Sequence, residues 1–441
     1  MNEIIRYFSE FSDIFLFWKT VGFAKFARFF WFFFIFELPR YVLFDFLVLV
    51  LFGVKSYFTR KKYRYARDLF FKESPLLSII VPGKDEGKHL VKLVNSLKEQ
   101  TYKNFEIIIV DDGSTDDTPT ICRNLLKRGL ITRYLRNEVR GGKASAANLG
   151  LNYARGKYII HIDADSSFDR DAIEKIIIPF YMDRRIGIVA GNVKVRNASD
   201  SVLTSLQAIE YLKSISIGRR ITSFLGILRV ASGAFGAFRK DILLRFGGWD
   251  VGPGLDGDIT VKVRKLNFKV YFEPRAICFT SAPSTFSGLT RQRIRWGRSL
   301  VRFRLRKHRD IFLPNQNFNV FNFLSSVENV FYSLLLNVNW LLYIGDIFIN
   351  LPHTAKFIIP INYLLYCLSN FVQYIMILAV SERRKDELKL AIYLPLMPLY
   401  MGIYMRFVRT WAYITELLFK ASYRDPWNPK KVSDKAKEIG I

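Results

Sequence analysis

Short runs of β-branched and aliphatic residues alternate with helical stretches between about residues 75 and 285. Three of these runs, at 77–81, 106–110 and 158–162, are almost continuously apolar. Strands that are buried on both faces of a parallel sheet show this pattern, and the intervening helices supply the crossovers. The pattern predicts an α/β domain with a parallel-rich mixed sheet flanked by helices.

Longer apolar segments lie on both sides of this region. Residues 41–58 are apolar for nearly the ~20 residues that a helix needs to cross a bilayer, and 23–36 form either a second span or an interfacial helix. Further candidate spans lie at 328–350, 356–380 and 390–412. Pro395 and Pro398 interrupt the last segment, which therefore either re-enters the membrane or breaks the charge rule once.

Basic residues gather next to the apolar segments, as in Arg60-Lys61-Lys62, and such clusters lie on the cytoplasmic side of membrane proteins. We therefore expect a multi-pass protein of the inner or plasma membrane with a cytoplasmic catalytic domain. The predicted parts are N-terminal membrane segments at 1–60, the catalytic domain at 61–285, interfacial helices at 286–325, C-terminal transmembrane helices at 326–420 and a basic tail at 421–441.

Composition supports lipid contact. Hydrophobic residues make up 50% of the 441 residues, with 40 Phe, and the formal net charge is +27. Because no nucleic-acid-reading module accompanies the charge, nucleic acid is not an expected partner. The three cysteines, Cys122, Cys278 and Cys367, lie far apart and lack the spacing of a metal site.

The first acidic motif, Asp111-Asp112-Gly113, follows the run at 106–110 directly. A carboxylate at a strand end can accept a hydrogen bond from the imide nitrogen of uracil, which predicts that Asp112 binds a nucleotide. The alternative is a turn that caps the next helix through Ser114 or Asp116. Pro82 and Glu86, which follow the run at 77–81, are predicted to line the same pocket.

The second motif, Asp163-Ala164-Asp165, follows the run at 158–162. Two carboxylates one residue apart can share one hard cation, so Asp163 and Asp165 are predicted ligands of Mg²⁺ or Mn²⁺, with Asp163 also contacting the nucleotide. Lys143 follows two glycines in a loop that lies between the motifs. This loop is either solvated or brings Lys143 to the bound nucleotide.

Two further motifs complete the set. Asp256 opens a predicted helix that runs through Lys265, where it serves either as a general base or as the helix N-cap, a role that Asp258 would fill equally well. Gln292, Arg295 and Trp296 share one face of a helix, where a guanidinium suits diphosphate oxygens and an indole suits a sugar ring. The alternative for this helix is a basic interfacial helix with a Trp anchor.

Three separated aspartate sites followed by Gln-x-x-Arg-Trp resemble the membrane-integrated family 2 glycosyltransferases, the group of cellulose, chitin, hyaluronan and poly-N-acetylglucosamine synthases. The resemblance implies a GT-A fold, with Asp112 at the base, Asp163 and Asp165 at the metal and Asp256 as the catalytic base. It also implies that Gln292, Arg295 and Trp296, with Ser232 and Gly233 of an acceptor-proximal loop, line the diphosphate and acceptor site. The family often has Glu before the base, where this chain has Leu255.

The resemblance favours an inverting enzyme that polymerises a UDP-sugar, with UDP-N-acetylglucosamine as the expected donor, into a β-linked polysaccharide and extrudes it. Expected partners are the donor, a growing polysaccharide or lipid-linked acceptor, and the lipid bilayer, with an accessory membrane or export subunit as a further candidate. The alternatives are a transferase that adds one sugar to a lipid carrier and a catalytically dead membrane scaffold or exporter.

Overall fold

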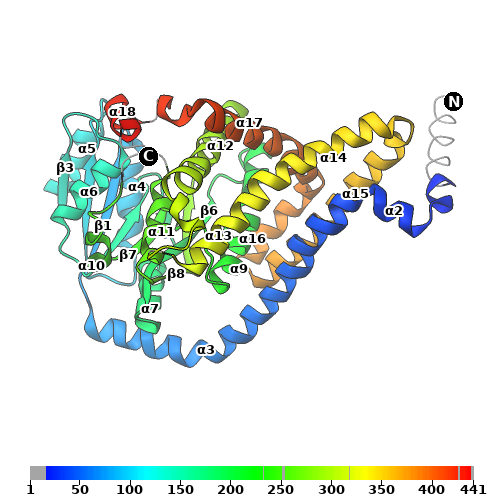
Figure 1. Cartoon of the computed structure of the whole chain (residues 1–441). Coiled ribbons are helices and arrows are strands. Elements are labelled where there is room, and N and C mark those ends of the chain that lie inside the picture. Colours follow the sequence, from blue (N-terminus) through cyan, green and yellow to red (C-terminus); the bar gives the residue numbers. More distant parts are fainter. Residues whose placement is uncertain (1–15, 232, 251–253, 317, 426–427, 439–441) are drawn as a thin grey trace. The chain divides into compact units, whose positions relative to one another are not determined.

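The computed structural model describes residues 16–231, 233–250, 254–316, 318–425 and 428–438, and these form two compact units. One unit comprises residues up to Leu51 together with Phe331–Arg406. The other comprises Phe52–Val330 and the segment from Phe407 onward, and it contains the sheet (Figure 1).

Eight strands among the described residues form one mixed sheet in the order β3-β2-β1-β4-β7-β6-β8-β5. The strands are β1 (Leu77–Gly83), β2 (Phe105–Asp111), β3 (Arg133–Arg136), β4 (Tyr158–Ile162), β5 (Ser167–Phe168), β6 (Ile186–Val195), β7 (Phe235–Arg239) and β8 (Lys269–Thr280). The neighbours β3, β2, β1 and β4 are parallel, whereas β7 runs antiparallel to both β4 and β6. The predicted parallel-rich α/β fold is confirmed.

Helices cover both faces of this sheet because alternate strand residues point to opposite sides. Ile79 and Ile107 belong to one buried cluster, and their neighbours Ile80 and Ile108 belong to another. The helices of this unit are α4 (Gly87–Lys98), α5 (Thr118–Lys127), α6 (Lys143–Tyr153), α7 (Ala172–Met182), α8 (Val202–Tyr211), α9 (Gly218–Phe224), α10 (Lys240–Leu244), α11 (Leu255–Lys265), α12 (Phe286–Leu300), α13 (Val320–Val330) and α18 (Lys430–Glu438). Three short segments, η3 (Leu212–Ile217), η4 (Val301–Lys307) and η5 (Arg309–Phe312), continue or link them, and η9 (Ala421–Arg424) precedes α18.

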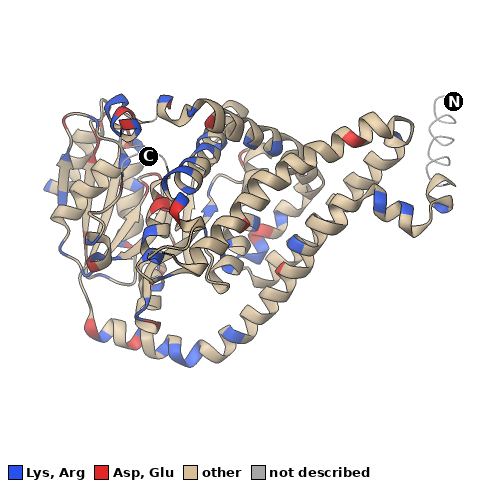
Figure 2. Ribbon diagram, viewed as in Figure 1, with Lys and Arg blue, Asp and Glu red and all other residues tan. Residues whose placement is uncertain are grey.

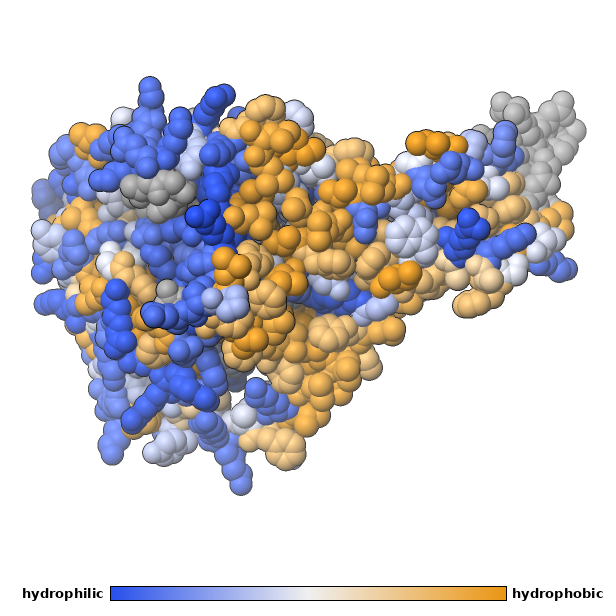
Figure 3. All heavy atoms as spheres, in the orientation of Figure 1, coloured by the Kyte–Doolittle hydropathy of each residue, from blue (hydrophilic) through white to orange (hydrophobic). Residues whose placement is uncertain are grey.

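The other unit is helical. It contains α2 (Phe23–Phe29), η1 (Phe33–Glu37), η2 (Pro39–Phe44), η6 (Phe331–Leu335), α14 (Leu336–Asn350), α15 (Pro352–Val380), α16 (Arg384–Leu388), η7 (Lys389–Leu396) and η8 (Pro398–Tyr404). Two long helices, α3 (Asp45–Glu73) and α17 (Met405–Phe419), start in this unit and continue into the sheet-bearing one. Hydrophobic residues dominate much of the surface over α13 and α14, whereas hydrophilic residues dominate the surface over the sheet (Figure 3).

Two helical stretches within the described residues, Val320–Asn350 and Pro352–Val380, are long and apolar enough to cross a membrane. A third candidate, Arg384–Leu396 with Pro398–Phe419, bends by 56° at its break, which agrees with the predicted interruption by proline. The predicted span 41–58 is not among these stretches, since α3 meets Lys55 early and becomes strongly basic from Arg60. Long apolar helices of this kind indicate a membrane protein.

Candidate active site

The ends of β1 and β2 lie side by side and bring the first acidic motif to the edge of the sheet. Pro82 pairs with Val110 and Gly83 with Asp111, and the Asp112 amide donates to the Gly83 carbonyl at 2.8 Å. Beyond the strand, Gly113 adopts a φ of +73°, a conformation that disfavours a side chain. The two loops that follow β1 and β2 therefore start next to one another.

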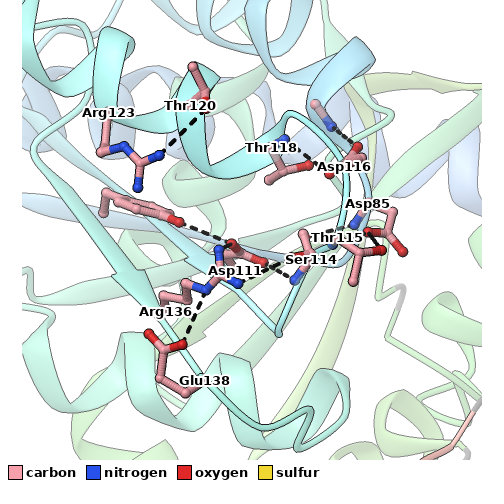
Figure 4. A network of polar contacts seen from close by, with 12 residues as sticks. Asp85, Asp111, Ser114, Thr115, Asp116, Thr118, Thr120, Arg123, Arg136 and Glu138 are labelled. Atoms are coloured by element: carbon pink, nitrogen blue, oxygen red, sulfur yellow. Dashed lines mark hydrogen bonds and ion pairs between the residues drawn. The ribbon is translucent and has the colours of Figure 1, made fainter.

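These two loops are joined by hydrogen bonds between their side chains and backbones (Figure 4). The amide of Asp85 donates to Ser114 Oγ at 2.8 Å, and the amide of Thr115 donates to Asp85 Oδ1 at 2.8 Å. Buried Asp111 accepts from the Ser114 amide at 2.7 Å. Asp111 and Asp85 therefore shape the loops that carry the candidate nucleotide-binding residues.

The alternative in which Ser114 or Asp116 is the N-cap of the next helix is wrong. Helix α5 starts at Thr118 with Asp117 as its N-cap residue, because Pro119 occupies an early helical position. Asp116 Oδ1 accepts from the Thr118 amide at 3.0 Å and supports the helix start from outside. Ser114 belongs to the loop contacts instead.

Asp112 holds the glycine loop that precedes α6. Its carboxylate accepts hydrogen bonds from Asn137 Nδ2 at 2.9 Å, the Gly141 amide at 2.8 Å and the Gly142 amide at 2.7 Å. The loop is therefore fixed at the sheet edge, and it ends at Lys143, the first residue of α6. The alternative of a freely solvated loop does not describe this arrangement.

Lys143 pairs with Asp163 of the second acidic motif. Asp165 Oδ2 accepts from Thr280 Oγ1 at 2.9 Å, and its carbonyl accepts from Arg196 Nη2 at 2.8 Å. The first two acidic motifs, 51 residues apart by the positions of Asp112 and Asp163, are thus linked through the Gly-Gly-Lys segment between them.

Carboxylates are concentrated around Asp163. Burial raises the pKa of Glu86 to about 7, and the charges of Asp165 and Asp163 add to this shift. The pKa of Asp165 is raised by burial and by Asp163. No group of three or more metal-ligating side chains is present among the described residues. The donor set nevertheless fits a divalent cation, because the carboxylates of Asp163 and Asp165 are close enough to interact electrostatically and a nucleotide diphosphate would supply further hard oxygens.

Asp256 lies in the first turn of α11, but it is not the N-cap of this helix. Gly254 takes that position in a left-handed conformation and has no side chain that could cap the helix. Asp256 accepts a hydrogen bond from the Gly233 amide. Burial raises the pKa of Asp256 to about 6, with a further contribution from Asp163 and an opposing one from Lys143.

Ser232, predicted beside Gly233 in the acceptor loop, lies outside the described residues. Gly233 itself lies against the candidate base, since a Cβ at this position would meet both carboxylate oxygens of Asp256 at 2.4 Å. A glycine is therefore required wherever the carboxylate rests in this way. This contact is compatible with the predicted role of the loop near the acceptor.

Helix α12 carries the Gln-x-x-Arg-Trp motif, and arginines follow its length (Figure 2). Arg293, between the motif residues, is buried and pairs with Glu210 of α8 at 2.7 Å. Gln292 Oε1 accepts from Arg293 Nη1 at 2.5 Å, and the Arg293 guanidinium carbon lies 4.3 Å from the centre of the Trp296 ring. Arg293 therefore anchors the helix and orients two of the predicted site residues.

Arg295 interacts electrostatically with the second acidic motif. Burial lowers the pKa of Arg295, and the nearby charges of Asp425 and Asp163 oppose this shift. Trp296 remains 42% exposed. Arg295, the predicted diphosphate-binding cation, is therefore close enough to interact electrostatically with Asp163, the predicted metal ligand. In the chain, 132 positions separate the two residues.

The segment after α17 also reaches this region, which the sequence did not predict. Asp425 acts on Arg295, and a Cβ at Gly142 would lie 3.4 Å from the Pro429 ring. Asn137 and the pair of Arg293 with Glu210 are further site residues that the motifs did not indicate. Only Glu210 left a signal, as the one charged residue of α8.

Comparison with known proteins agrees with this geometry. Residues 78–246 match glycosyl transferase family 2. Poly-beta-1,6-N-acetyl-D-glucosamine synthase from Staphylococcus epidermidis strain RP62A is 33% identical over 250 residues, which are 55% of this chain and 60% of the relative. The enzyme of the same name from Staphylococcus aureus strain COL is 31% identical over 250 residues with the same coverage. The chain thus spans 60% of the length of these relatives.

The fold also has a solved counterpart. A mannosyltransferase from Pyrobaculum calidifontis, solved with GDP-Man and Mn2+, covers 86% of this chain and 99% of its own with a TM-score of 0.55. At 18% identity this likeness concerns the fold alone. The predicted GT-A fold is confirmed, and the match of residues 78–246 to glycosyl transferase family 2 agrees with the family that the motifs predicted.

Proposed function

We propose that this protein is a membrane-bound inverting glycosyltransferase that polymerises UDP-N-acetylglucosamine into a β-linked polysaccharide. The observation that carries the proposal is the position of Asp163, whose charge acts on Glu86, Lys143, Asp256 and Arg295. Residues for the metal, the base and the leaving group thus share one electrostatic environment. Relatives named as synthases of a β-1,6-linked N-acetylglucosamine polymer support the donor and the product.

The donor would bind at the ends of β1, β2 and β4. Asp112 would contact the base beside Pro82 and Glu86, and Lys143 would contact the phosphates. Asp163 and Asp165 would hold Mg²⁺ or Mn²⁺, and the solved mannosyltransferase contains Mn2+. The cation would add positive charge beside the diphosphate oxygens.

Asp256 is the proposed base. With a pKa of about 6 it is largely ionised at neutral pH and still basic enough to accept a proton. It takes the proton of the acceptor hydroxyl while the hydroxyl oxygen bonds to the anomeric carbon. The bond from that carbon to the diphosphate oxygen breaks, and UDP departs with the electron pair. One displacement from the opposite face inverts the configuration.

Arg295 stabilises the departing diphosphate in this proposal. A guanidinium in a partly dry site offsets growing negative charge more effectively than it would in water. Trp296, half-exposed beside Arg293, offers its indole to the acceptor sugar together with Gln292 and Gly233. The acceptor is the growing polysaccharide or a lipid-linked sugar.

Catalysis would take place on the cytoplasmic face of the inner or plasma membrane. The stretches Val320–Asn350 and Pro352–Val380, with the bent pair that follows, are the candidates for carrying the product outward, with or without an accessory export subunit. Within the helical unit, Asn337 Nδ2 donates to the Arg406 carbonyl at 3.1 Å. Asn337, a polar residue within an apolar stretch, thus contributes to packing between helices.

A donor screen tests the proposal. The protein, purified in lipid nanodiscs, is incubated with UDP-N-acetylglucosamine, UDP-glucose or UDP-galactose, with Mn²⁺, Mg²⁺ or a chelator. UDP release is measured and products are sized. A ladder of N-acetylglucosamine oligomers with metal is expected. A single glycolipid product contradicts polymerisation, and the absence of UDP release from every donor contradicts the transferase function itself.

A further inference from the structure

His161 is a polar residue in the middle of the sheet that the proposed reaction does not use. It is the fourth residue of β4, whose other members are apolar or aromatic, and it is 1% exposed. A buried imidazole costs free energy unless it is hydrogen-bonded. It lies two residues before Asp163, near the end of the strand that leads into the acidic motif.

The imidazole is held in one orientation. His161 Nδ1 lies 2.8 Å from the Gly233 carbonyl oxygen. Because a carbonyl only accepts, Nδ1 must carry the proton, which leaves Nε2 without a proton in the neutral ring. The Trp249 ring packs against the imidazole with centroids 5.3 Å apart, and Asn148 of α6 holds the Trp249 backbone through two hydrogen bonds of 2.8 Å.

Gly233 connects this imidazole to Asp256. Its carbonyl accepts from His161, its amide donates to the Asp256 carboxylate, and its Cα is too close to that carboxylate to carry a side chain. The neighbouring Ala234 carbonyl accepts from the Asp163 amide at 3.3 Å. A glycine has wide conformational freedom, so its orientation depends on the groups that hold it.

We propose that His161 is a positioning residue for the transfer reaction. Its Nδ1 donates to the Gly233 carbonyl and thereby fixes the glycine against which Asp256 rests. The inference rests on the proposed function for its catalytic consequence. Loss of the donor frees the Gly233 peptide, and the Asp256 carboxylate samples orientations that miss the acceptor hydroxyl. Small displacements of a catalytic group reduce the rate strongly while substrate binding is retained.

The test uses two substitutions of His161. Phe fills the space without a donor, whereas the Asn side-chain amide can place N–H near the position of Nδ1. We expect His161→Phe to lower kcat roughly ten- to hundredfold with KM for the donor changed less than about twofold. Hydrogen exchange at the Gly233 and Ala234 amides should increase in this variant. His161→Asn should restore most of both properties.

Ser78→Ala is the matched control. Ser78 is also buried in a strand of the sheet and bonds Glu106 at 2.6 Å and the Gly156 amide at 2.7 Å, at the opposite end of β1 from the site. This variant should lose thermal stability with an unchanged kcat.

The proposal is overturned if His161→Phe keeps the wild-type kcat or if its kcat falls without faster exchange at Gly233. It is also overturned if His161→Asn restores neither kcat nor the slow exchange. Faster exchange in a protein that transfers no sugar supports the hydrogen bond and contradicts the proposed function.

Discussion

Two aspartates in one turn of α11 have opposite surroundings. Asp256 faces Gly233 and the acidic motif, and burial raises its pKa to about 6. Asp258 is 4% exposed and accepts a hydrogen bond from His308 Nε2 at 2.8 Å. Its carboxylate also forms ion pairs with Lys307 Nζ at 2.7 Å and Lys262 Nζ at 3.4 Å. Burial alone would raise the pKa of Asp258, but these partners hold it well below its usual range.

The difference separates a reactive carboxylate from a structural one. Asp258 ties α11 to η4 and the segment after it, since its partners Lys307 and His308 lie there. The negative charge of buried Asp256 is offset less completely by nearby cations, so this carboxylate keeps a higher affinity for a proton. Paired carboxylates contribute to stability, whereas a carboxylate with a raised pKa is available for proton transfer.

The largest expected effect is that of Asp256→Asn. The amide keeps the shape of the side chain but cannot take a proton, so kcat should fall by roughly 10³-fold or more. Thermal stability should be unchanged or higher, because a neutral amide avoids the burial of a charge. UDP release and a melting curve of the same sample check both parts. Full activity in this variant would remove Asp256 as the base.

Asp258→Asn should have the opposite result. Removing one member of a buried charged cluster costs about 3 kcal/mol of stability, whereas kcat of the folded protein should change only a few-fold. The stability that Asp258 provides is present above its unfolded pKa and is lost as the pH falls below that value, and the variant should lack this pH dependence. Asp310→Asn, at a half-exposed pair with Lys265, is the control and should cost much less. A larger loss of kcat in Asp258→Asn than in Asp256→Asn would reverse the comparison.

The pH dependence of the wild type should follow Asp256. The base must be ionised, so kcat should fall as the pH decreases through about 6 and be about tenfold lower at pH 5 than on the plateau. Glu86, with a pKa raised to about 7, is a second group that titrates in this range. In Glu86→Gln, kcat should still fall as the pH decreases through about 6. A wild-type kcat that stays constant down to about pH 5 would contradict the assignment of Asp256 as the base.

The smallest expected effect concerns Asp425, whose charge acts on Arg295, the residue proposed to stabilise the departing diphosphate. Asp425→Asn should lower KM for the donor by roughly two- to fivefold at unchanged kcat, because Arg295 then interacts less with the protein and more with diphosphate. Asp434→Asn, at an exposed position of α18, should change neither value. An increase of KM in Asp425→Asn would mean that this residue assists donor binding instead.

Sequence patterns were sufficient for the strands and the motif positions. β4 spans the predicted residues 158–162, β1 and β2 contain the predicted runs, and α12 carries Gln292 to Trp296 as a helix. Local hydrophobic pattern determines such elements because a strand buried on both faces has few other ways to exclude water. The bend within the last candidate membrane segment likewise follows from proline chemistry.

Partner choice depended on contacts between distant parts of the chain. Their place at the start of one helix does not distinguish Asp256 from Asp258, and only the resemblance of the motifs assigned the base to Asp256. His308 and Lys307 lie about fifty positions from Asp258 and meet it only after η4 folds back onto α11. The pairing of Arg293 with Glu210 and the approach of Asp425 to Arg295 arise in the same way.

The sequence by itself indicated the family, and it determined the sheet and the set of acidic and basic side chains available for the reaction. Tertiary structure alone decided which carboxylate is neutralised by cations and which retains a raised pKa. The physical reason is that a pKa depends on burial and on charges within a few ångströms, and both are set by packing between segments that are far apart in the chain.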